Sequence, residues 1–306
     1  MSTPLVTIRC LVYNHEPYLR QCLDGFVMQK TNFPFEAIVH DDASTDRSAE
    51  IIREYAEKYP DIIKPIFETE NQYSKCVGSI RRIMNENTRG KYVAMCEGDD
   101  YWIDPLKLQK QIDFLETNSE YSMCFHNAQM HYENCEKKDK LFSNIKNRDY
   151  TGVEIYANWI VPTASVVFNS SILFSDRYAD VMSNDNFVFR DTILFLICSE
   201  AGKIRGFSDV MSVYRRHNGG ITHNVTLSRI TRFINHHLEI SKVFGNKYIQ
   251  ASENKCVESY CQTFYKSLKN GILNISILKK SFKLSYIRTV KCLIFQLCLF
   301  LKHKNK

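Results

Sequence analysis

The chain has 306 residues, of which 44% are apolar and 24% are charged, a composition that excludes an intrinsically disordered protein. Its formal net charge of +6 is local, because ten Lys or Arg residues follow the last acidic residue, Glu258, and the rest of the chain carries 30 basic and 34 acidic residues. We therefore expect no nucleic-acid partner, since the body of the protein lacks the basic excess that phosphates attract.

Short β-rich runs alternate with amphipathic helical stretches over the first 130 residues, a pattern typical of βαβ units around a mainly parallel sheet. We predict four strands in this part, at residues 5–12, 35–40, 62–67 and 91–96. Helices are predicted from Pro17 to about 29, from the Ser44-Thr45-Asp46 turn to Tyr59-Pro60, at about 80–87, and from Pro105 onward. The predicted fold class is α/β.

Two acidic clusters directly follow predicted strands. Asp41 and Asp42 come after the second strand, and Glu97, Asp99 and Asp100 come after the fourth. Because open α/β sheets bind their ligands at the carboxyl ends of their strands, this placement indicates a ligand site.

The second cluster holds three carboxylates within four residues, and Gly98 leaves room for a ligand to approach the backbone. Repulsion between the carboxylates favours a bound hard cation, Mn²⁺ or Mg²⁺, that a diphosphate could share. The alternative is an acidic turn in which Asp99 or Asp100 only caps the helix that starts at Pro105.

The first cluster runs into Ser44-Thr45-Asp46, and Asp46 could simply begin the next helix, since Asp, Ser and Thr are common caps. Asp41 and Asp42 precede that position, at the mouth of the predicted sheet. There a carboxylate can accept hydrogen bonds from a base N–H or from ribose hydroxyls. Helix capping and nucleoside recognition both stay open for this cluster.

Later segments are less regular. Residues 131–150 are polar and without periodicity, and we predict an acceptor-side loop there before regular structure resumes at 159–168. An apolar helix is predicted at 192–198, opened by Asp191, and a short strand is predicted just before Tyr214. Beyond about Thr226 the composition is helical.

Six motifs occur in a specific order and spacing. They are Val12-Tyr13-Asn14, Asp41-Asp42-x-Ser44-Thr45-Asp46, Glu97-x-Asp99-Asp100, Tyr101-Trp102-x-Asp104-Pro105-x-Lys107-Leu108, Arg190-Asp191 and Val213-Tyr214-Arg215-Arg216-His217-Asn218-Gly219-Gly220. Together they resemble glycosyltransferase family 2 over roughly residues 3–225. The resemblance implies a GT-A fold, with a mainly parallel Rossmann-like sheet flanked by helices. It also implies transfer of a sugar from a nucleotide-diphospho-sugar, with inversion.

The resemblance implies that Asp41 and Asp42 recognise the nucleoside, and that Tyr13 and Glu16 border its base. UDP is the expected nucleotide. The implied domains are a GT-A catalytic domain at 1–225, with a nucleotide-binding half at about 1–130 and an acceptor half at about 131–225, and a helical extension at 226–306.

Glu97 and Asp99 take the positions of the family's D-x-D motif. Glu97 departs from the usual Asp, so Asp99 is the firmer metal ligand, while Glu97 is assigned to ribose or to a metal-bound water. Asp100 is a further metal candidate, and Gly98 is assigned to the donor site. The resemblance therefore implies Mn²⁺ or Mg²⁺ as the cofactor.

The family's catalytic base stands at the start of a helix after a central strand, and Asp191 matches that position. Many relatives carry an acidic pair here, whereas Arg190 precedes Asp191 in this chain, so the assignment depends on Asp191 alone. A helix cap is the alternative role for Asp191, and Asp185 is the alternative base.

Residues 214–220 combine Arg215, His217 and two glycines, a set suited to closing over the diphosphate of the donor. His217 could also bind the metal ion through a ring nitrogen. The alternative is a basic surface turn with an exposed His217.

Residues 292–301 form an apolar run bracketed by Arg288, Lys291, Lys302, Lys304 and Lys306. Ten residues are too few to span a bilayer, which needs about 20. We therefore predict a helix that lies in a membrane interface, held by anionic headgroups, or alternatively a helix docked on the protein or on another subunit. Membrane association suits a lipid-linked or glycan acceptor of O-antigen or capsule synthesis.

Eleven cysteines without a C-x-x-C pair favour a reducing compartment, so we expect a cytoplasmic protein associated peripherally with the inner face of the plasma membrane. The sequence specifies no oligomeric state. Two other functions compete: a sugar nucleotidyltransferase, whose first strand normally leads into a glycine-rich loop that residues 13–17 lack, and a non-catalytic carbohydrate-binding or scaffold protein.

Overall fold

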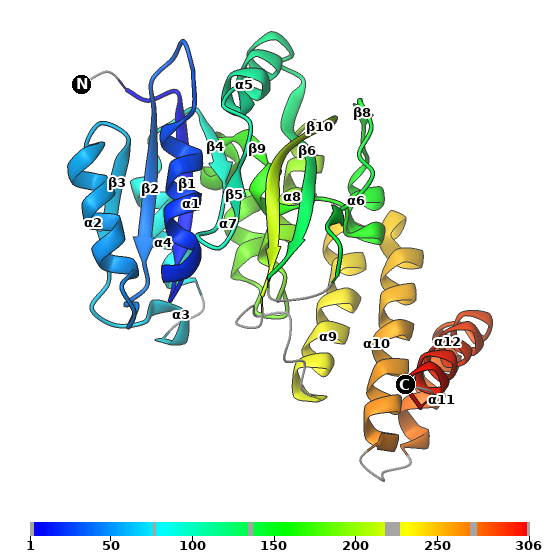
Figure 1. The fold of residues 1–306 in the computed structure, drawn as a ribbon. Helices are drawn as coiled ribbons and strands as arrows, with labels where there is room; N and C mark the ends of the chain where they lie inside the picture. Colours follow the sequence, from blue (N-terminus) through cyan, green and yellow to red (C-terminus); the bar gives the residue numbers. More distant parts are fainter. Residues whose placement is uncertain (1–2, 76–77, 134–136, 218–226, 270–273, 305–306) are drawn as a thin grey trace. The chain divides into compact units, whose positions relative to one another are not determined.

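The structure is a computed structural model that describes residues 3–75, 78–133, 137–217, 227–269 and 274–304 (Figure 1). The chain divides into two compact units. The first unit combines Met1–Ser183 with Leu194–Asn218, and the second combines Asn184–Ile193 with Gly219–Lys306.

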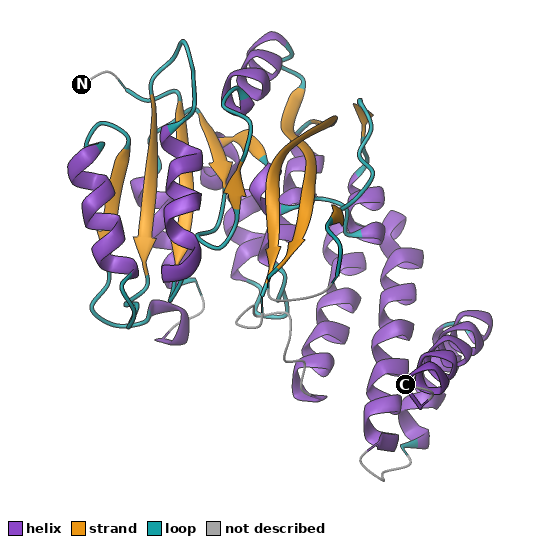
Figure 2. Ribbon diagram, viewed as in Figure 1, coloured by secondary structure: helices purple, strands orange, loops and turns teal. Residues whose placement is uncertain are grey.

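The first unit is built on one mixed sheet with helices packed against it (Figure 2). Its strands are β1 (Val6–Val12), β2 (Phe35–Asp41), β3 (Ile63–Phe67), β4 (Tyr92–Met95), β5 (Tyr101–Trp102), β6 (Tyr121–Tyr132), β7 (Lys140–Leu141), β8 (Arg148–Asp149), β9 (Val167–Asn169) and β10 (Lys203–Arg216). The strand order is β3-β2-β1-β4-β9-β6-β10-β5, with β7 beside β6 and β8 beside β10. This arrangement confirms the predicted α/β class.

Pairing within the sheet is parallel from β3 to β4, so the carboxyl ends of β1, β2 and β4 lie at one edge. Strand β9 runs antiparallel to both β4 and β6, and β10 is parallel to β6 and antiparallel to β5. Strand β1 has no exposed side chain on either face, as a central parallel strand requires, and its sequence is apolar except for Thr7 and Arg9.

The helices that the sequence predicts in the first 130 residues are all present, together with three short helices in the described part of this unit that it does not predict. They are α1 (Glu16–Val27), α2 (Ser48–Lys58), α3 (Gln72–Lys75), α4 (Ser79–Asn87), α5 (Lys107–Thr117), α6 (Gly152–Asn158) and α7 (Asp176–Ser183), and α8 (Arg190–Ala201) starts in the second unit. Helices α1 and α2 lie side by side (Figure 1), joined by a hydrogen bond of 2.6 Å from Tyr55 Oη to Asp24 Oδ1. Their apolar faces cover the sheet.

The prediction of an irregular loop at 131–150 was wrong in part. Strand β6 continues to Tyr132, β7 pairs with β6, and β8 pairs with β10, although residues 134–136 lie outside the described part of the chain. Polar exposed strands of two residues leave no periodic signal in a sequence. The short strand predicted before Tyr214 is the end of the 14-residue β10.

Lys107, the first residue of α5, is fully buried. Its Nζ donates to Gln111 Oε1 at 2.8 Å and lies 4.0 Å from the ring centroid of Trp102. Burial lowers the pKa of this ammonium from 10.5 to about 7, and the nearby Cys96 opposes the shift only weakly. Burying Lys107 therefore costs folding free energy, because the folded state disfavours the ammonium form that the unfolded chain keeps at neutral pH.

Replacing Lys107 with Met should change how stability depends on pH. Between pH 7 and 10.5 the unfolded wild-type chain binds more protons than the folded chain, so its free energy of unfolding rises with pH, by up to about 1.4 kcal/mol per pH unit. The variant lacks this contribution. Urea titrations at pH 7, 8 and 9 with a reductant should show that the free energy of unfolding rises more steeply with pH for the wild type than for Lys107→Met. Parallel pH profiles would contradict the lowered pKa of Lys107.

The second unit is helical beyond its short first segment. Its helices are α9 (Leu227–Phe244), α10 (Ile249–Lys269), α11 (Ile275–Leu284) and α12 (Tyr286–Lys304). Ile230 and Ile234 of α9 pack with Cys256 of α10 in a small apolar core. None of the helices in the described part of the chain is long and apolar enough to cross a membrane.

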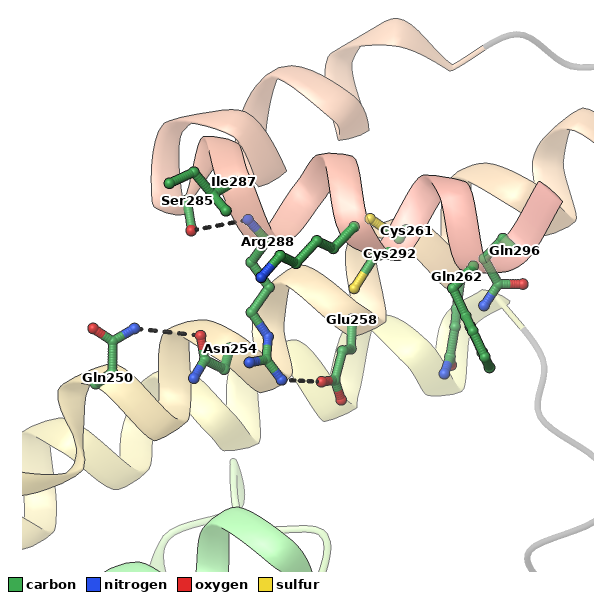
Figure 3. Close-up of a pocket in the computed structure, with 12 residues that line it drawn as sticks. Gln250, Asn254, Glu258, Cys261, Gln262, Ser285, Ile287, Arg288, Cys292 and Gln296 are labelled. Atoms are coloured by element: carbon green, nitrogen blue, oxygen red, sulfur yellow. Dashed lines mark hydrogen bonds and ion pairs between the residues drawn. The ribbon is translucent and has the colours of Figure 1, made fainter. Parts of the chain in front are cut away.

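Helix α12 packs on its neighbours by one face. Thr289 is buried and its Oγ1 lies 2.8 Å from Ser281 Oγ. Arg288 donates to Glu258 of α10 at 2.6 Å (Figure 3). A pocket of about 610 Å³ lies between α10 and α12 and is lined mainly by amide and charged side chains. Ile287 and Phe295, which also line it, are 69% and 61% exposed.

Candidate active site

Two loops at the carboxyl edge of the sheet are joined by hydrogen bonds. Residues 13–16 after β1 form the first loop, and residues 42–48 after β2 form the second. Asn14 N donates to Ser44 Oγ at 2.9 Å, and Thr45 N donates back to Asn14 Oδ1 at 2.8 Å. Asn14 and Ala43 both adopt the left-handed conformation, with φ of 56° and 59°. The two loops therefore form one ordered wall.

The acidic side chains of this wall have different partners. Glu16 Oε2 accepts from Arg47 N at 3.1 Å, while Asp46 accepts from Glu16 N and from Ser48 N, both at 2.9 Å. Asp46 thus holds the first residue of α2, although the N-cap of this helix is Arg47, which makes no side-chain cap bond. Tyr13 is about half exposed at the rim. Glu16, which the family resemblance places beside the base, joins the two loops by accepting from Arg47 N.

Asp41 and Asp42 are both buried but have different partners. Asp42 accepts from Gln72 N at 2.6 Å and from Tyr73 N at 3.1 Å, so both of its oxygens hold the start of α3. Asp41 Oδ2 accepts a longer bond of 3.3 Å from Ser44 N. Asp41 Oδ1 is buried and has no hydrogen-bond partner within the described residues. Of the two carboxylates, only Asp41 keeps an oxygen without a hydrogen-bond partner among the described residues.

Position 98 needs a glycine, because the neighbouring side chains leave no room for a Cβ. A Cβ at this position would meet His15 Nδ1 at 2.7 Å and Val12 Cγ2 at 3.0 Å. Gly98 N donates to Leu11 O at 3.0 Å, which fixes the second acidic cluster against the end of β1. The space next to Gly98 is thus filled by His15, whose Nδ1 is itself buried without a partner in the described part of the chain.

Asp99 and His217 form a direct pair. Asp99 Oδ2 lies 3.0 Å from His217 Nε2, and the two side chains are 21% and 9% exposed. The His217 ring packs against Tyr18, with 4.7 Å between ring centroids. Burial raises the pKa of Asp99, but the hydrogen bond from His217 and the charge of His15 outweigh it and hold that pKa below the usual value. Asp99 is therefore a carboxylate at neutral pH.

Asp100 turns inward. Its Oδ1 accepts from Arg215 N at 2.8 Å, and burial, followed by the charge of Asp99, raises its pKa well above the ordinary value. Glu97, in contrast, is exposed. The carboxylates of this cluster thus occupy three different environments within four residues.

The Arg215 guanidinium is also directed into the protein. It donates to Asp99 O at 2.8 Å, to Gln21 Oε1 at 2.7 Å and to Glu133, and it lies over the rings of Tyr18 and Tyr101. All three of its nitrogens therefore have protein acceptors, and Arg215 fixes the backbone that carries Asp99. The sequence instead predicts that Arg215 closes over the diphosphate of the donor.

A metal ion could be accommodated at Asp99 and His217. No group of three or more His, Cys, Asp or Glu side chains within the described ranges is arranged to hold an ion. Mg²⁺ is commonly held by only one or two protein ligands together with substrate phosphates, and adjacent ligands of an octahedral ion are about 3 Å apart. The 3.0 Å between Asp99 Oδ2 and His217 Nε2 fits such a pair.

Asp191 and Asp185 belong to the second unit. Asp191 lies in the first turn of α8 and is partly buried, whereas the Asp185 side chain is 84% exposed and lies 3.9 Å from Arg190. Asn218, Gly219 and Gly220 of the loop expected to close over the donor lie outside the described residues. The same holds for the side chains of residues 297–301 in the apolar run.

Several residues of this site have no signal in the sequence. Gln21 and Glu133 hold Arg215 from α1 and from the end of β6, more than 80 residues away in both cases. His15 and Tyr18 contact the second cluster and His217, respectively. A histidine in the turn after β1, next to the recognised Tyr13-Asn14, was the one available hint.

Comparison with known proteins is consistent with this geometry. A family model described as glycosyl transferase family 2 matches residues 10–173. An uncharacterized protein of Mycobacterium tuberculosis (strain ATCC 25618 / H37Rv) is 37% identical over 227 residues, which cover 73% of this chain and 62% of that protein. The chain therefore spans 62% of the length of that relative. The putative glycosyltransferase EpsE of Bacillus subtilis (strain 168) is 34% identical over 122 residues, 40% of this chain and 42% of that protein.

Solved structures share the fold. S. aureus TarS 1-349 in complex with UDP-GlcNAc has a TM-score of 0.63 at 14% identity, over 97% of this chain and 92% of that chain. The mannosyltransferase PcManGT from Pyrobaculum calidifontis, in complex with GDP-Man and Mn²⁺, has a TM-score of 0.56 at 16% identity, over 99% and 87%. These likenesses confirm the predicted GT-A fold. Since the family model covers more than half of the 306 residues, the chain belongs to glycosyl transferase family 2.

Proposed function

We propose that this chain transfers a sugar from a nucleotide-diphospho-sugar, with UDP as the nucleotide, to an acceptor hydroxyl with inversion. The observation that carries the proposal is the Asp99–His217 pair at the carboxyl edge of the sheet, next to the wall that presents the unpartnered oxygen of Asp41. A nucleoside diphosphate needs a hydrogen-bond acceptor for its nucleoside and a cation site for its diphosphate, and the proposal assigns these roles to Asp41 and to the Asp99–His217 pair. The catalytic domain is proposed to cover residues 1–225, with 226–306 as a helical extension.

The nucleoside is proposed to bind at the two-loop wall. Asp41 Oδ1 accepts a base N–H or a ribose hydroxyl, because it is buried and otherwise lacks a partner. Tyr13 offers a half-exposed ring on which the base can stack, and Glu16 and Asp42 keep the wall in shape. Glu97, exposed beside the wall, is proposed to reach the ribose.

The diphosphate is proposed to lie at Asp99 and His217, which would hold Mn²⁺ or Mg²⁺. When bound, such an ion neutralises the negative charge that grows on the departing nucleoside diphosphate. Arg215 and Asp100 support this position, since each holds the backbone of the other's strand or turn. Asp100, a third metal candidate from the sequence, contributes in this proposal through that support.

Asp191 is proposed as the general base that takes the proton from the acceptor hydroxyl as it attacks the anomeric carbon. A general base must be ionised and well placed, and an aspartate with an ordinary pKa near 4 is ionised at neutral pH. One displacement inverts the anomeric configuration. The assignment of Asp191 is supported by the family resemblance and by its place in the first turn of α8.

A screen of sugar donors tests the proposed function. UDP-Glc, UDP-Gal, UDP-GlcNAc and UDP-GalNAc, with GDP- and dTDP-sugars as controls, are incubated with the protein and Mn²⁺, and release of the nucleoside diphosphate is followed with and without a lipid-diphosphate acceptor. We expect slow release from one donor that an acceptor accelerates. Release of pyrophosphate from a nucleoside triphosphate and a sugar phosphate would instead identify a nucleotidyltransferase. Absence of any turnover would leave a binding protein.

A lipid-linked acceptor and contact with the inner face of the plasma membrane are proposed from α12. Ile287, Lys291, Ile294 and Phe295 recur at helical spacing on the face of α12 that the other helices leave exposed. An exposed face that mixes large apolar side chains with lysine suits the interface of an anionic bilayer.

Replacing Ile287 and Phe295 together with Glu should abolish this binding. The double variant removes apolar area and adds two negative charges to the exposed face, so binding to vesicles that contain phosphatidylglycerol should fall at least tenfold in a sedimentation assay. Tyr73→Glu, which changes an exposed aromatic residue of the first unit, is the matched control. Equal vesicle binding by the double variant and the wild type would disprove membrane contact through α12.

A further inference from the structure

The segment Asn184–Ile193, which carries Asp191, is held by helix α9. Asn184 Nδ2 donates to Glu239 Oε1 at 3.1 Å, and Val188 N donates to His236 Nδ1 at 3.3 Å. Glu239 and His236 lie three residues apart on α9, so they face the same side of the helix. Both bonds join parts of the second unit.

Aromatic contacts reinforce the two hydrogen bonds. The His236 ring meets Phe187 and Phe189 edge to face, with centroid distances of 5.7 and 5.0 Å and interplanar angles of 84° and 82°. Phe189 also packs against Phe233 at 4.8 Å, and Phe187 packs against Phe244 at 6.2 Å. His236 is fully buried between the two phenylalanines of the segment. Edge-to-face pairs fix orientation as well as distance.

His236 acts as an acceptor because it is neutral. Burial, followed by the charges of Arg190 and Lys255, lowers its pKa to about 3. A neutral imidazole has one acceptor nitrogen and one N–H, and the bond from Val188 N assigns the acceptor to Nδ1. His236 thus directs one acceptor at the backbone of the segment, while its Nε2–H is buried without a partner among the described residues.

Val188 and Phe189 immediately precede α8, and Ile193 N donates to Phe189 O at 3.1 Å to close the first turn. Asp191 lies inside that turn. A helix start is defined by the backbone positions of these few residues, so whatever fixes Val188 and Phe189 also sets the direction in which Asp191 leaves the backbone.

We propose that His236, with Glu239 as the second contact, is a positioning residue for the general base, so that the helical extension is part of the catalytic machinery. This proposal rests on the proposed function, since it takes Asp191 as the base. It predicts that a change on α9, some 45 residues after Asp191 in the sequence, alters turnover without altering recognition of the donor.

Three variants test the proposal. His236→Leu keeps the bulk but removes the acceptor, and His236→Asn restores an acceptor close to the position of Nδ1. Ile234→Ala is the matched control, because it weakens the packing of α9 on α10 and leaves the hydrogen bonds to Asn184 and Val188 in place. Each variant is measured by hydrogen exchange of the peptide that covers residues 186–193 and by kcat and donor KM, using the donor that the screen selects.

His236→Leu should speed exchange in residues 186–193 and lower kcat at least tenfold with donor KM within twofold of the wild type. His236→Asn should recover most of both. Unchanged exchange, or unchanged kcat despite faster exchange, overturns the proposal. So does an equal loss of kcat in Ile234→Ala, which would indicate a general loss of stability. If His236→Leu does not fold, Asn184→Ala, at a partly exposed position, removes the contact with Glu239 and should produce the same split between kcat and KM.

The proposed function can fail separately from this inference. If no donor is turned over by the wild type, the transferase assignment fails, and the exchange measurements alone still decide whether His236 orders the segment. If Asp191→Asn is fully active while His236→Leu lowers kcat, the base is misassigned and the positioning of Asp191 is overturned with it.

Discussion

Asp191→Asn is expected to lower kcat for sugar transfer by about 10² to 10⁴-fold, the range that loss of a general base produces. The amide has nearly the same shape as the carboxylate but cannot take a proton at neutral pH. Because the proposed donor site is formed by Asp41 of β2 and by residues that follow β1, β2, β4 and β10, donor KM should change little. Steady-state kinetics at saturating donor and acceptor provide the measurement.

Asp185→Asn is the matched control for this prediction. It makes the same chemical change six residues earlier in the same segment, at a side chain that is 84% exposed and paired only loosely with Arg190. We expect near-normal turnover from it. Full activity of Asp191→Asn together with a collapse in Asp185→Asn would transfer the role to Asp185, the alternative that the sequence offers.

Asp99→Asn is expected to lower kcat/KM by at least about 10²-fold, because the proposed site loses the charge that would hold an ion and stabilise the leaving diphosphate. The variant would also lose the carboxylate oxygen that lies 3.0 Å from His217 Nε2. The metal concentration that gives half-maximal turnover should rise in parallel, and a titration with Mn²⁺ measures it. This second readout separates loss of a metal ligand from a general defect.

Two further variants test whether the effect of Asp99→Asn is specific to the proposed metal site. His217→Gln removes the other member of the pair and should raise the metal requirement in the same direction, since the amide does not place a ring nitrogen at the position of Nε2. Asp113→Asn on the exposed face of α5 makes the same change as Asp99→Asn at a residue that only accepts a surface hydrogen bond from Gln109. An Asp99→Asn enzyme with unchanged dependence on Mn²⁺ would refute the metal assignment.

The sequence could predict the fold of the first 130 residues well because its signals are local. Four strands, the helices between them and the place of both acidic clusters follow from apolar runs that end in polar turns, and each was found within a few residues of its prediction. The rule that ligands bind at the carboxyl ends of parallel strands then predicts where a ligand site lies. The family motifs add a predicted role for each cluster.

The roles of neighbouring carboxylates could not be predicted, because partners distant in the sequence decide them. Asp42 is occupied by amides from residues 72 and 73, whereas Asp41 keeps a buried oxygen without a partner among the described residues. The motif predicts that Arg215 binds the donor. In the structure its guanidinium instead donates to acceptors from α1, from the end of β6 and from the Asp99 turn. Three-dimensional contacts of this kind leave no periodicity in one sequence.

The position of strand β10 in the sheet affects how the chain behaves during synthesis and when it is truncated. The strand lies between β6 and β5, and its partners on those strands lie about 80 to 110 residues earlier in the chain. A ribosome-bound chain that ends before residue 216 therefore exposes the edges of both strands, and open edges recruit other chains. A fragment trimmed to residues 10–173, the segment matched by the family model, should aggregate for the same reason.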